Sequence, residues 1–314
     1  KIRIIKEIGE IVSTCHKLPE MVLHRDIKPS NIMIEGLDYS DYSYEKLYVL
    51  DFDMSWHKNS SEKDIIFESR DDLGYLAPEQ TDPSRSVTTR SAKVDTYGLG
   101  MTAFALFGGR HPAAGWTMAA DWPQRVESVT RQGYKLDWKC LPMRAARTVI
   151  EATRVEQSDR LDFTSFARRF ERMCPPSFGE KEDAPIDIIA EEVLATVADG
   201  QKYIWDDIED RGHVKFANGT SFWVEVENSQ KALQIKVRFE DTGAAVFQAK
   251  KQLLGEAKDL FDTLGKRDEY RIKRSSIANS EVDLIAHVTI GNSLMASRRC
   301  ALELQPCIDR LKRI

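Results

Sequence analysis

Cysteines are few in this sequence, and they share no pattern. Five occur among 314 residues, and no pair has the spacing of a zinc knuckle or of a redox CxxC motif. An odd and scattered set of this kind argues against a disulfide framework and is typical of reduced thiols inside the cell. We therefore predict a cytoplasmic protein. The five positions are Cys15, Cys140, Cys174, Cys300 and Cys307.

A long apolar segment and a strong excess of one charge are also missing. The most hydrophobic stretch, residues 98–109, is far shorter than the roughly 20 residues that span a bilayer, and no secretory signal opens the chain. We expect no membrane partner. The 45 basic and 50 acidic residues give a formal net charge of −5, which is too balanced for a polyanionic ligand. Nucleic acid is therefore not expected as a partner either.

The composition does supply enough apolar material for a folded core. Hydrophobic residues make up 42% and charged residues 30%, which excludes a disordered or fibrous chain. The length fits one large domain or two ordinary ones. The chain starts at Lys1, inside a helical pattern and without a methionine, so we expect it to be part of a longer protein.

The first 175 residues read as a mainly helical region with one short hairpin. A polar segment over 35–45 joins two short strands, and a long stretch over 52–89 has little periodicity and reads as a functional loop. The apolar spacing predicts the helices. The expected strands are 32–34 and 47–50, and the expected helices are 1–18, 94–107, 117–132, 143–156 and 163–173.

The composition then changes, which predicts a domain boundary. Residues 181–210 contain ten acidic and two basic side chains, so we expect an acidic linker or helix over 179–212. Beyond it, alternating apolar residues and the Asn218-Gly219 hairpin signal predict a small α+β domain with an antiparallel sheet over 213–314. Its role is open between recruitment, sensing and oligomerisation. The expected strands are 213–217, 221–227, 232–239 and 283–290, with helices over 242–264 and 294–311.

Residues 24–31 carry the most specific pattern of the chain. They read His-Arg-Asp-Ile-Lys-Pro-Ser-Asn and precede a hydrophobic strand. This string resembles the catalytic loop of eukaryotic-type Ser/Thr protein kinases. Other features follow in the order of that family: Asp51-Phe52-Asp53 in place of its DFG motif, Ala77-Pro78-Glu79 as its APE motif, Asp95 and Gly98 in an apolar helix, and Arg160.

The resemblance implies a fold and a chemistry. The fold class would be α+β, with a mainly helical kinase C-lobe over 1–178. The chemistry would be transfer of the γ-phosphoryl group of ATP to a protein hydroxyl, with Mg²⁺ and possible use of Mn²⁺. Asp26 would orient and deprotonate the acceptor, and Lys28 would meet the charge on the transferred group. Asn31 and Asp51 would hold the metal, because Mg²⁺ prefers oxygen ligands.

Other matching residues are expected to support that site. Asp95 would hold the backbone of the catalytic loop, Glu79 and Arg160 would form a buried ion pair, and His24 would be a packed core residue. Arg25 resembles the family's partner of a phosphorylated activation loop. The available acceptors are Ser60, Ser61 and Ser69, and the alternative is that Asp71 or Asp72 supplies the negative charge permanently.

Two substitutions depart from the family pattern. Asp53 replaces the glycine of the DFG motif, which should stiffen that turn. Asp72 stands where Ser/Thr kinases usually carry a threonine, and a second carboxylate near Asp26 would repel it or shift its pKa.

The 314 residues also contain no glycine-rich strand-turn-strand, no VAIK-like lysine and no matching glutamate helix. We therefore expect the ATP-clamping N-lobe to precede Lys1 or to lie in a separate segment, and this chain alone to transfer phosphate poorly. One alternative is a pseudokinase that binds a partner as a scaffold. Another is a kinase-fold enzyme that phosphorylates a small molecule or a nucleic acid. The oligomeric state stays open.

Overall fold

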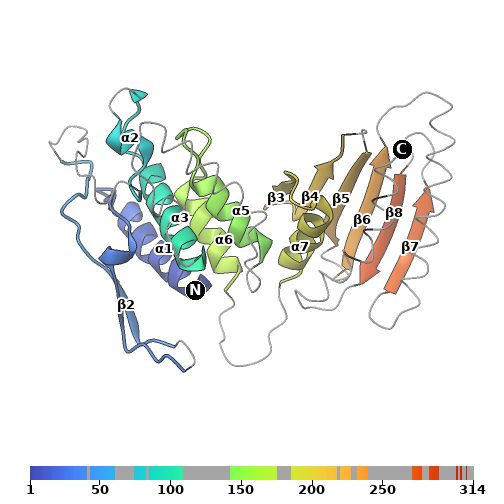
Figure 1. Cartoon of the computed structure of the whole chain (residues 1–314), viewed down its shortest axis with the longest axis horizontal. Helices are drawn as coiled ribbons and strands as arrows, with labels where there is room; N and C mark the ends of the chain where they lie inside the picture. The colour runs from blue at the N-terminus through green and yellow to red at the C-terminus, as the bar shows by residue number, and fades with distance from the viewer. Residues whose placement is uncertain are drawn as a thin grey trace. The chain divides into compact units, whose positions relative to one another are not determined.

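The computed structural model divides the chain into two compact units (Figure 1). The first comprises Lys1–Leu141 and Ala145–Phe178, and the second comprises Pro142–Arg144 and Gly179–Ile314. Both helices and antiparallel strands occur, so the predicted α+β class is confirmed. The structure describes residues 1–40, 43–60, 74–82, 85–108, 142–174, 185–217, 220–227, 232–239, 271–277 and 283–289, and the single positions Leu302, Gln305 and Asp309.

The first unit is mainly helical. Helices α1, α3 and α6 pack against one another. The elements are α1 (Ile2–Lys17), the 3₁₀ turn η1 (Pro29–Asn31), β1 (Ile32–Glu35), β2 (Lys46–Val49), α2 (Pro78–Thr81), α3 (Ala92–Gly108), α5 (Met143–Ala152) and α6 (Phe163–Arg172). The helices predicted over 1–18, 94–107, 143–156 and 163–173 are thus confirmed, while 117–132 lies outside the described residues.

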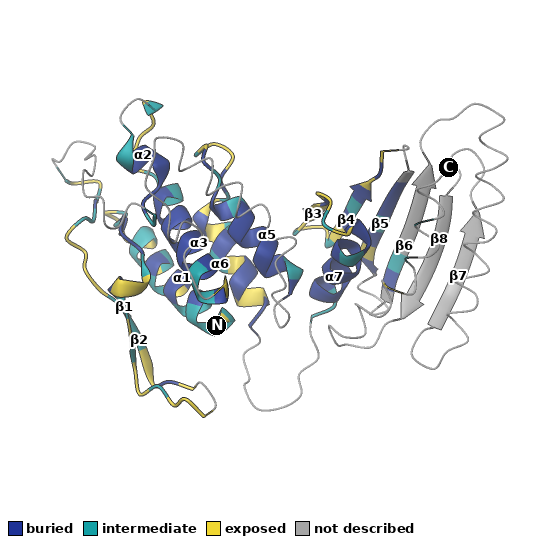
Figure 2. Ribbon diagram, in the orientation of Figure 1, coloured by how far each residue is buried: buried dark blue, intermediate teal, exposed yellow. Residues whose placement is uncertain are grey.

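Helix α3 is buried on nearly all sides (Figure 2), as its uninterrupted apolar sequence predicted. Two glycines let neighbours approach its backbone closely. A Cβ added at Gly98 would lie 3.0 Å from the carbonyl oxygen of Ile27, and one at Gly100 would lie 2.8 Å from Cβ of Ala152. Glycine costs about 1 kcal/mol in a helix relative to alanine, so the close approach of the Ile27 carbonyl explains the use of glycine at position 98.

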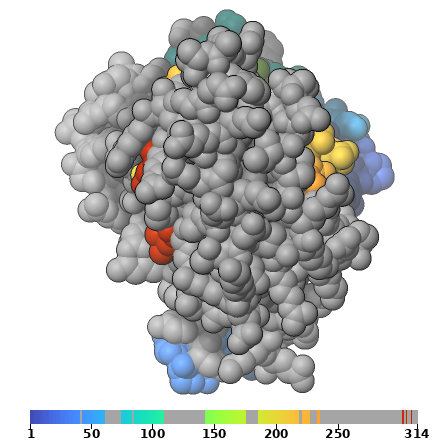
Figure 3. Space-filling model, turned by 90° about the vertical axis from the view of Figure 1, so that its right-hand side faces the viewer, coloured from blue at the N-terminus to red at the C-terminus, as the bar shows by residue number. Residues whose placement is uncertain are grey.

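Strands β1 and β2 form the predicted hairpin. They pair antiparallel from Ile32 opposite Val49 to Glu35 opposite Lys46, and the hairpin projects at the foot of both Figure 1 and Figure 3. Next to it, Tyr44 is buried beneath the guanidinium of Arg3, which lies 4.5 Å from the ring centroid. Burial and the nearby Glu7 carboxylate raise the pKa of Tyr44 well above its ordinary value.

In the part of the second unit that the structure describes, helix α7 accompanies a six-stranded antiparallel sheet of order β3-β4-β5-β6-β8-β7. Helix α7 packs on β4 and β5, and Val214, Phe222 and Val224 are buried there. The elements are α7 (Ile186–Ala198), β3 (Ile204–Asp206), β4 (Arg211–Lys215), β5 (Thr220–Glu227), β6 (Ala232–Phe239), β7 (Arg271–Ile277) and β8 (Asp283–Thr289). Strands β4, β5, β6 and β8 were predicted. The helix expected over 242–264 lies outside the described residues, and the three positions described within 294–311 are helical.

The acidic segment is more structured than its composition indicated. Its helix α7 buries Asp187 and Glu191, which accept hydrogen bonds from Arg144 at 2.6 and 2.7 Å. Between α7 and β4, strand β3 was not predicted, because its buried residue, Trp205, is followed by the mostly acidic residues 206–210. Asp206 accepts the N–H groups of Ile208 and Glu209, and these hydrogen bonds lower its pKa.

In the parts of the chain that the structure describes, no helix is long and apolar enough to cross a bilayer.

Candidate active site

Asp26 lies at the centre of the site, and its side chain is almost fully buried. Lys28 Nζ lies 2.9 Å from Asp26 Oδ2. Asn31 Nδ2 donates to the same oxygen at 3.1 Å and to the Asp26 carbonyl at 2.9 Å. The three residues predicted to carry catalysis are therefore in mutual contact. The other carboxylate oxygen, Oδ1, is buried and has no hydrogen-bond partner among the described residues.

Asp95, on α3, fixes the backbone of the two residues that precede Asp26. Asp95 Oδ1 accepts the N–H of Arg25 at 2.6 Å, and Asp95 Oδ2 accepts the N–H of His24 at 3.0 Å. The contact predicted for Asp95 is thus present. His16, at the end of α1, adds a contact that the sequence did not indicate, because its Nε2 lies 2.7 Å from Asp95 Oδ2. A charged carboxylate makes stronger hydrogen bonds than a neutral acceptor, which suits it to hold a loop.

His24 links the loop of Asp26 to the segment of Asp51. Its side chain is fully buried, as predicted for a core histidine. The ring Nδ1 accepts the N–H of Asp26 at 3.2 Å, so the ring hydrogen is assigned to Nε2, which donates to the Leu50 carbonyl at 3.0 Å. The ring also lies 4.5 Å from that of Phe52.

Asp51 lies two residues after the end of β2 and is exposed, with a positive φ of 62°. Its neighbour Leu50 donates its N–H to the Asn31 carbonyl at 2.8 Å, which places the ends of η1 and β2 side by side. The amide of Asn31 turns its Nδ2 toward Asp26, so its Oδ1 is the atom left for a cation. Asp53 donates its N–H to Asp51 Oδ1 at 3.4 Å, and the turn forms with aspartate in place of glycine.

A metal at this site would have one amide and one carboxylate ligand. Within the described ranges, no group of three or more His, Cys, Asp or Glu side chains could hold a metal. Mg²⁺ in phosphate-transferring sites usually takes one or two protein ligands and completes its shell with waters and phosphate oxygens. The donor set of Asn31 and Asp51 fits that ion.

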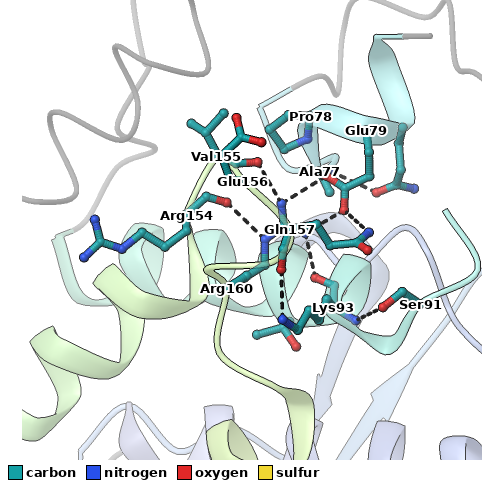
Figure 4. A network of polar contacts seen from close by, with 12 residues as sticks. Ala77, Pro78, Glu79, Ser91, Lys93, Arg154, Val155, Glu156, Gln157 and Arg160 are labelled. Carbon is teal, nitrogen blue, oxygen red and sulfur yellow. Dashed lines mark hydrogen bonds and ion pairs between the residues drawn. The ribbon is translucent and has the colours of Figure 1, made fainter. Parts of the chain in front are cut away.

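The buried pair of Glu79 and Arg160 is also present, as predicted (Figure 4). Arg160 Nη1 and Nη2 donate to the two oxygens of Glu79 at 2.6 and 3.0 Å. Gln157 Nε2 donates to Glu79 Oε1 at 2.8 Å. Lys93 Nζ donates to the carbonyls of Gln157 and Ser158 at 2.9 and 3.0 Å. Gln157 and Lys93 belong to no motif that the sequence displayed.

Gln80, which follows Glu79, was also missed. Its Oε1 accepts the N–H of Ala77 at 2.9 Å, and its Nε2 donates to the Arg25 carbonyl at 2.8 Å. The only sequence signal was its spacing, because glutamine three residues after a helix cap can reach back to the cap backbone.

The residues predicted for regulation are only partly described. Arg25 is buried with a positive φ of 69°, and Ser60 donates its N–H to the His57 carbonyl. Ser61, Ser69, Asp71 and Asp72 lie outside the described residues.

Comparison with known families agrees with this geometry. The family model described as "Protein kinase domain" matches residues 2–166, more than half of the chain. The chain belongs to the protein kinase family. The kinase motifs quoted above, from the loop of Asp26 to Arg160, all fall inside the matched range.

Several curated kinases are similar to part of this kinase chain. Aurora kinase A-B of Xenopus laevis is 31% identical over 108 residues, which cover 34% of this chain and 22% of that protein. Receptor-interacting serine/threonine-protein kinase 3 of Rattus norvegicus is 29% identical over 111 residues, covering 34% and 21%. L-type lectin-domain containing receptor kinase V.5 of Arabidopsis thaliana is 28% identical over 114 residues, covering 35% and 15%. The matched segment thus spans between 15% and 22% of the length of these relatives.

Proposed function

We propose that this chain carries the C-lobe of a Ser/Thr-type protein kinase, which transfers the γ-phosphoryl group of Mg-ATP to a protein hydroxyl. The observation that carries the proposal is the state of the Asp26 carboxylate. One oxygen is held by Lys28 and Asn31, while the other is buried without a partner in the described part of the chain. A buried oxygen that accepts no hydrogen bond is costly unless a bound group donates one to it. The hydroxyl group of a protein substrate would donate that hydrogen bond.

Asp26 then has a defined task. Its Oδ1 accepts a hydrogen bond from the substrate hydroxyl and orients the hydroxyl oxygen for attack on the γ-phosphorus. As the new O–P bond forms and the bond to the leaving β-phosphate oxygen breaks, the hydroxyl proton passes to Asp26. Lys28 offsets negative charge on both the Asp26 carboxylate and the transferred group. Asn31 holds Asp26 in this orientation through Nδ2.

Asn31 Oδ1 and Asp51 would hold the metal ion, either Mg²⁺ or Mn²⁺. The bound metal neutralises charge on the β- and γ-phosphates. The hydrogen bond from Leu50 to Asn31 keeps the two ligands at the same end of the hairpin.

The nucleotide also needs an N-lobe. Three large apolar side chains beside the metal ligands, Met33, Leu50 and Phe52, are 46%, 40% and 37% exposed. A kinase N-lobe and the adenine that it clamps would cover such a surface. We therefore propose that transfer requires the N-lobe of the full-length protein and that this chain alone is a poor catalyst.

Regulation would act on Arg25. In one version of the proposal, phosphate on Ser60, Ser61 or Ser69 supplies the negative charge that orders the loop before Glu79. In the other version, Asp71 or Asp72 supplies it permanently. Mapping phosphosites on active protein separates the two, because phosphate between Asp51 and Glu79 is required only by the first.

The alternative function is a pseudokinase scaffold. Asp53 is the observation that favours it, since an added carboxylate beside Asp51 alters the charge at the metal site. The assembled contacts of Asp26, Lys28 and Asn31 favour the enzyme, because a scaffold has no chemical need for them.

The test is phosphorylation by the full-length protein with Mg-ATP, followed by intact-mass measurement and mapping of the labelled residues. We expect label on serine or threonine of the protein itself or of added protein substrates. Asp51→Asn should abolish it, whereas Asp38→Asn, an exposed change on the hairpin, should not. ATP binding without any label on protein would contradict the proposal and support the scaffold, while label confined to a small molecule or nucleic acid would redefine the acceptor.

A further inference from the structure

The backbone just before Asp26 has an unusual conformation. Arg25 has a φ of 69°, in the left-handed region that residues other than glycine rarely adopt. A conformation of this kind persists only where the surrounding structure fixes it, and such positions concentrate at functional sites. The contacts that fix the backbone of Arg25 therefore also fix the direction in which the backbone enters Asp26.

Two buried side chains hold the backbone of Arg25, one at each end of the residue. Asp95, on α3, accepts the Arg25 N–H at 2.6 Å. Gln80, on α2, donates from Nε2 to the Arg25 carbonyl at 2.8 Å and is 1% exposed. The Arg25 carbonyl shares one planar peptide unit with the Asp26 N–H. Gln80 thus holds the peptide plane that leads into Asp26.

The orientation of Gln80 is itself fixed. Its Oε1 accepts the Ala77 N–H at 2.9 Å, so the amide cannot turn over without losing both hydrogen bonds. Ala77 caps α2 and Gln80 lies within it, in the later part of the segment that was predicted as a loop over 52–89. A displacement of the Ala77 backbone would therefore act on the Arg25 carbonyl through the Gln80 side chain.

We propose that Gln80 is a positioning residue for phosphoryl transfer, which couples the end of the loop after Asp51 to the orientation of the Asp26 carboxylate. The inference rests on the proposed function. Gln80 touches no reacting atom and acts through the Arg25–Asp26 peptide. Misplacement of a catalytic group by about 1 Å can cost on the order of 100-fold in rate, so a small rotation of this peptide would suffice.

Gln80→Met in the full-length protein tests the proposal, because methionine keeps the volume and loses both hydrogen bonds. We expect kcat to fall by about 10- to 100-fold, with KM for the protein substrate unchanged. Gln157→Met is the matched control. Like Gln80, Gln157 makes two hydrogen bonds, here to Glu79 and to the Thr88 carbonyl, and among the described residues neither partner belongs to the loop of residues 24–31. Its variant should lose stability and keep kcat, and equal kcat values for the two variants would overturn the proposal.

Gln80→Glu supplies a second kinetic test. A protonated glutamic acid can accept from the Ala77 N–H and donate its O–H to the Arg25 carbonyl, as glutamine does. The ionised form cannot donate, and burial disfavours it. We expect Gln80→Glu to approach the wild-type kcat at about pH 6 and to lose activity relative to wild type as the pH rises. A Glu variant no faster than the Met variant at the acidic end would contradict the role of the donated hydrogen bond.

Hydrogen exchange of the backbone amides separates this inference from the proposed function, because it needs no activity. In Gln80→Met, we expect the amides of residues 22–31 to exchange faster than in Gln157→Met. Unchanged exchange in this segment would overturn the inference even in an active kinase. Faster exchange in a protein that transfers no phosphate would support the contact and contradict the function.

Discussion

At the scale of single residues, the site is held by side chains that lie far from it in the sequence. Asp26, Lys28 and Asn31 could be predicted, because one short string carries all three. Asp95 could be predicted as well, since it opens an apolar helix at the family's spacing. Gln80 and His16 could not, because their contacts depend on how α2 and α1 pack. Such roles depend on which residues the fold brings into contact, and local sequence patterns do not show this.

We predict that the ion pair of Glu79 and Arg160 makes a large contribution to the free energy of unfolding. Glu79→Gln keeps the shape of the side chain and leaves the buried Arg160 guanidinium without its charge partner. Removing one side of a buried pair costs about 3–5 kcal/mol, so the free energy of unfolding from urea titration should fall by that order.

The control for this prediction is Glu156→Gln, because Glu156 pairs with Arg85 near the surface. Exposed pairs contribute only about 0–1 kcal/mol. Similar losses in the two variants would show that burial does not determine the strength of the Glu79 pair.

At the scale of elements, the hydrophobic pattern was sufficient to predict a helix or strand whose residues share the same surroundings. Helix α3 was predicted because it is apolar all round, and the hairpin of β1 and β2 because its strands are short and apolar. Strand β3 was hidden by its acidic neighbours, and β7 (Arg271–Ile277) by its charged and serine residues. Strand β7 is defined by its pairing with β8, which is a tertiary contact and leaves no local signal.

Helix α6 gives a prediction about pH. Asp162 caps its N-terminus by accepting the Ser165 N–H at 2.8 Å. Burial alone would raise the pKa of Asp162, but the hydrogen bonds from Ser165 hold it below its ordinary value. Because the folded-state pKa is depressed, this stabilisation is present above the unfolded pKa of about 3.9 and is lost as the pH falls through the folded value.

Asp162→Ala should therefore lower the free energy of unfolding by about 0.5–2 kcal/mol at neutral pH. The difference from wild type should shrink in acid, as measured by urea titration over a pH series. Asp162→Asn, which preserves the cap, should show a smaller loss at neutral pH. A difference that grows as the pH falls would contradict the assigned role of the carboxylate.

At the scale of the whole molecule, the kinase family and the site belong to the first unit. The matched range ends at residue 166, before helix α7 and the antiparallel sheet. The sequence predicted that a second α+β region follows the kinase motifs, but it carried no motif that assigns the region a chemistry. The proposed phosphoryl transfer therefore depends on Asp26 and on the complete protein around it.

The rate of the first turnover in the full-length protein tests whether Asp26 is the general base. Asp26→Asn is compared with Asp162→Asn, and Mg-ATP binding is measured on both by calorimetry. We predict that Asp26→Asn lowers the transfer rate by about 10²- to 10⁴-fold, the usual contribution of a general base. It should leave the affinity for Mg-ATP unchanged, and Asp162→Asn should transfer at the wild-type rate. An Asp26→Asn protein that phosphorylates its substrate as fast as wild type would contradict the account.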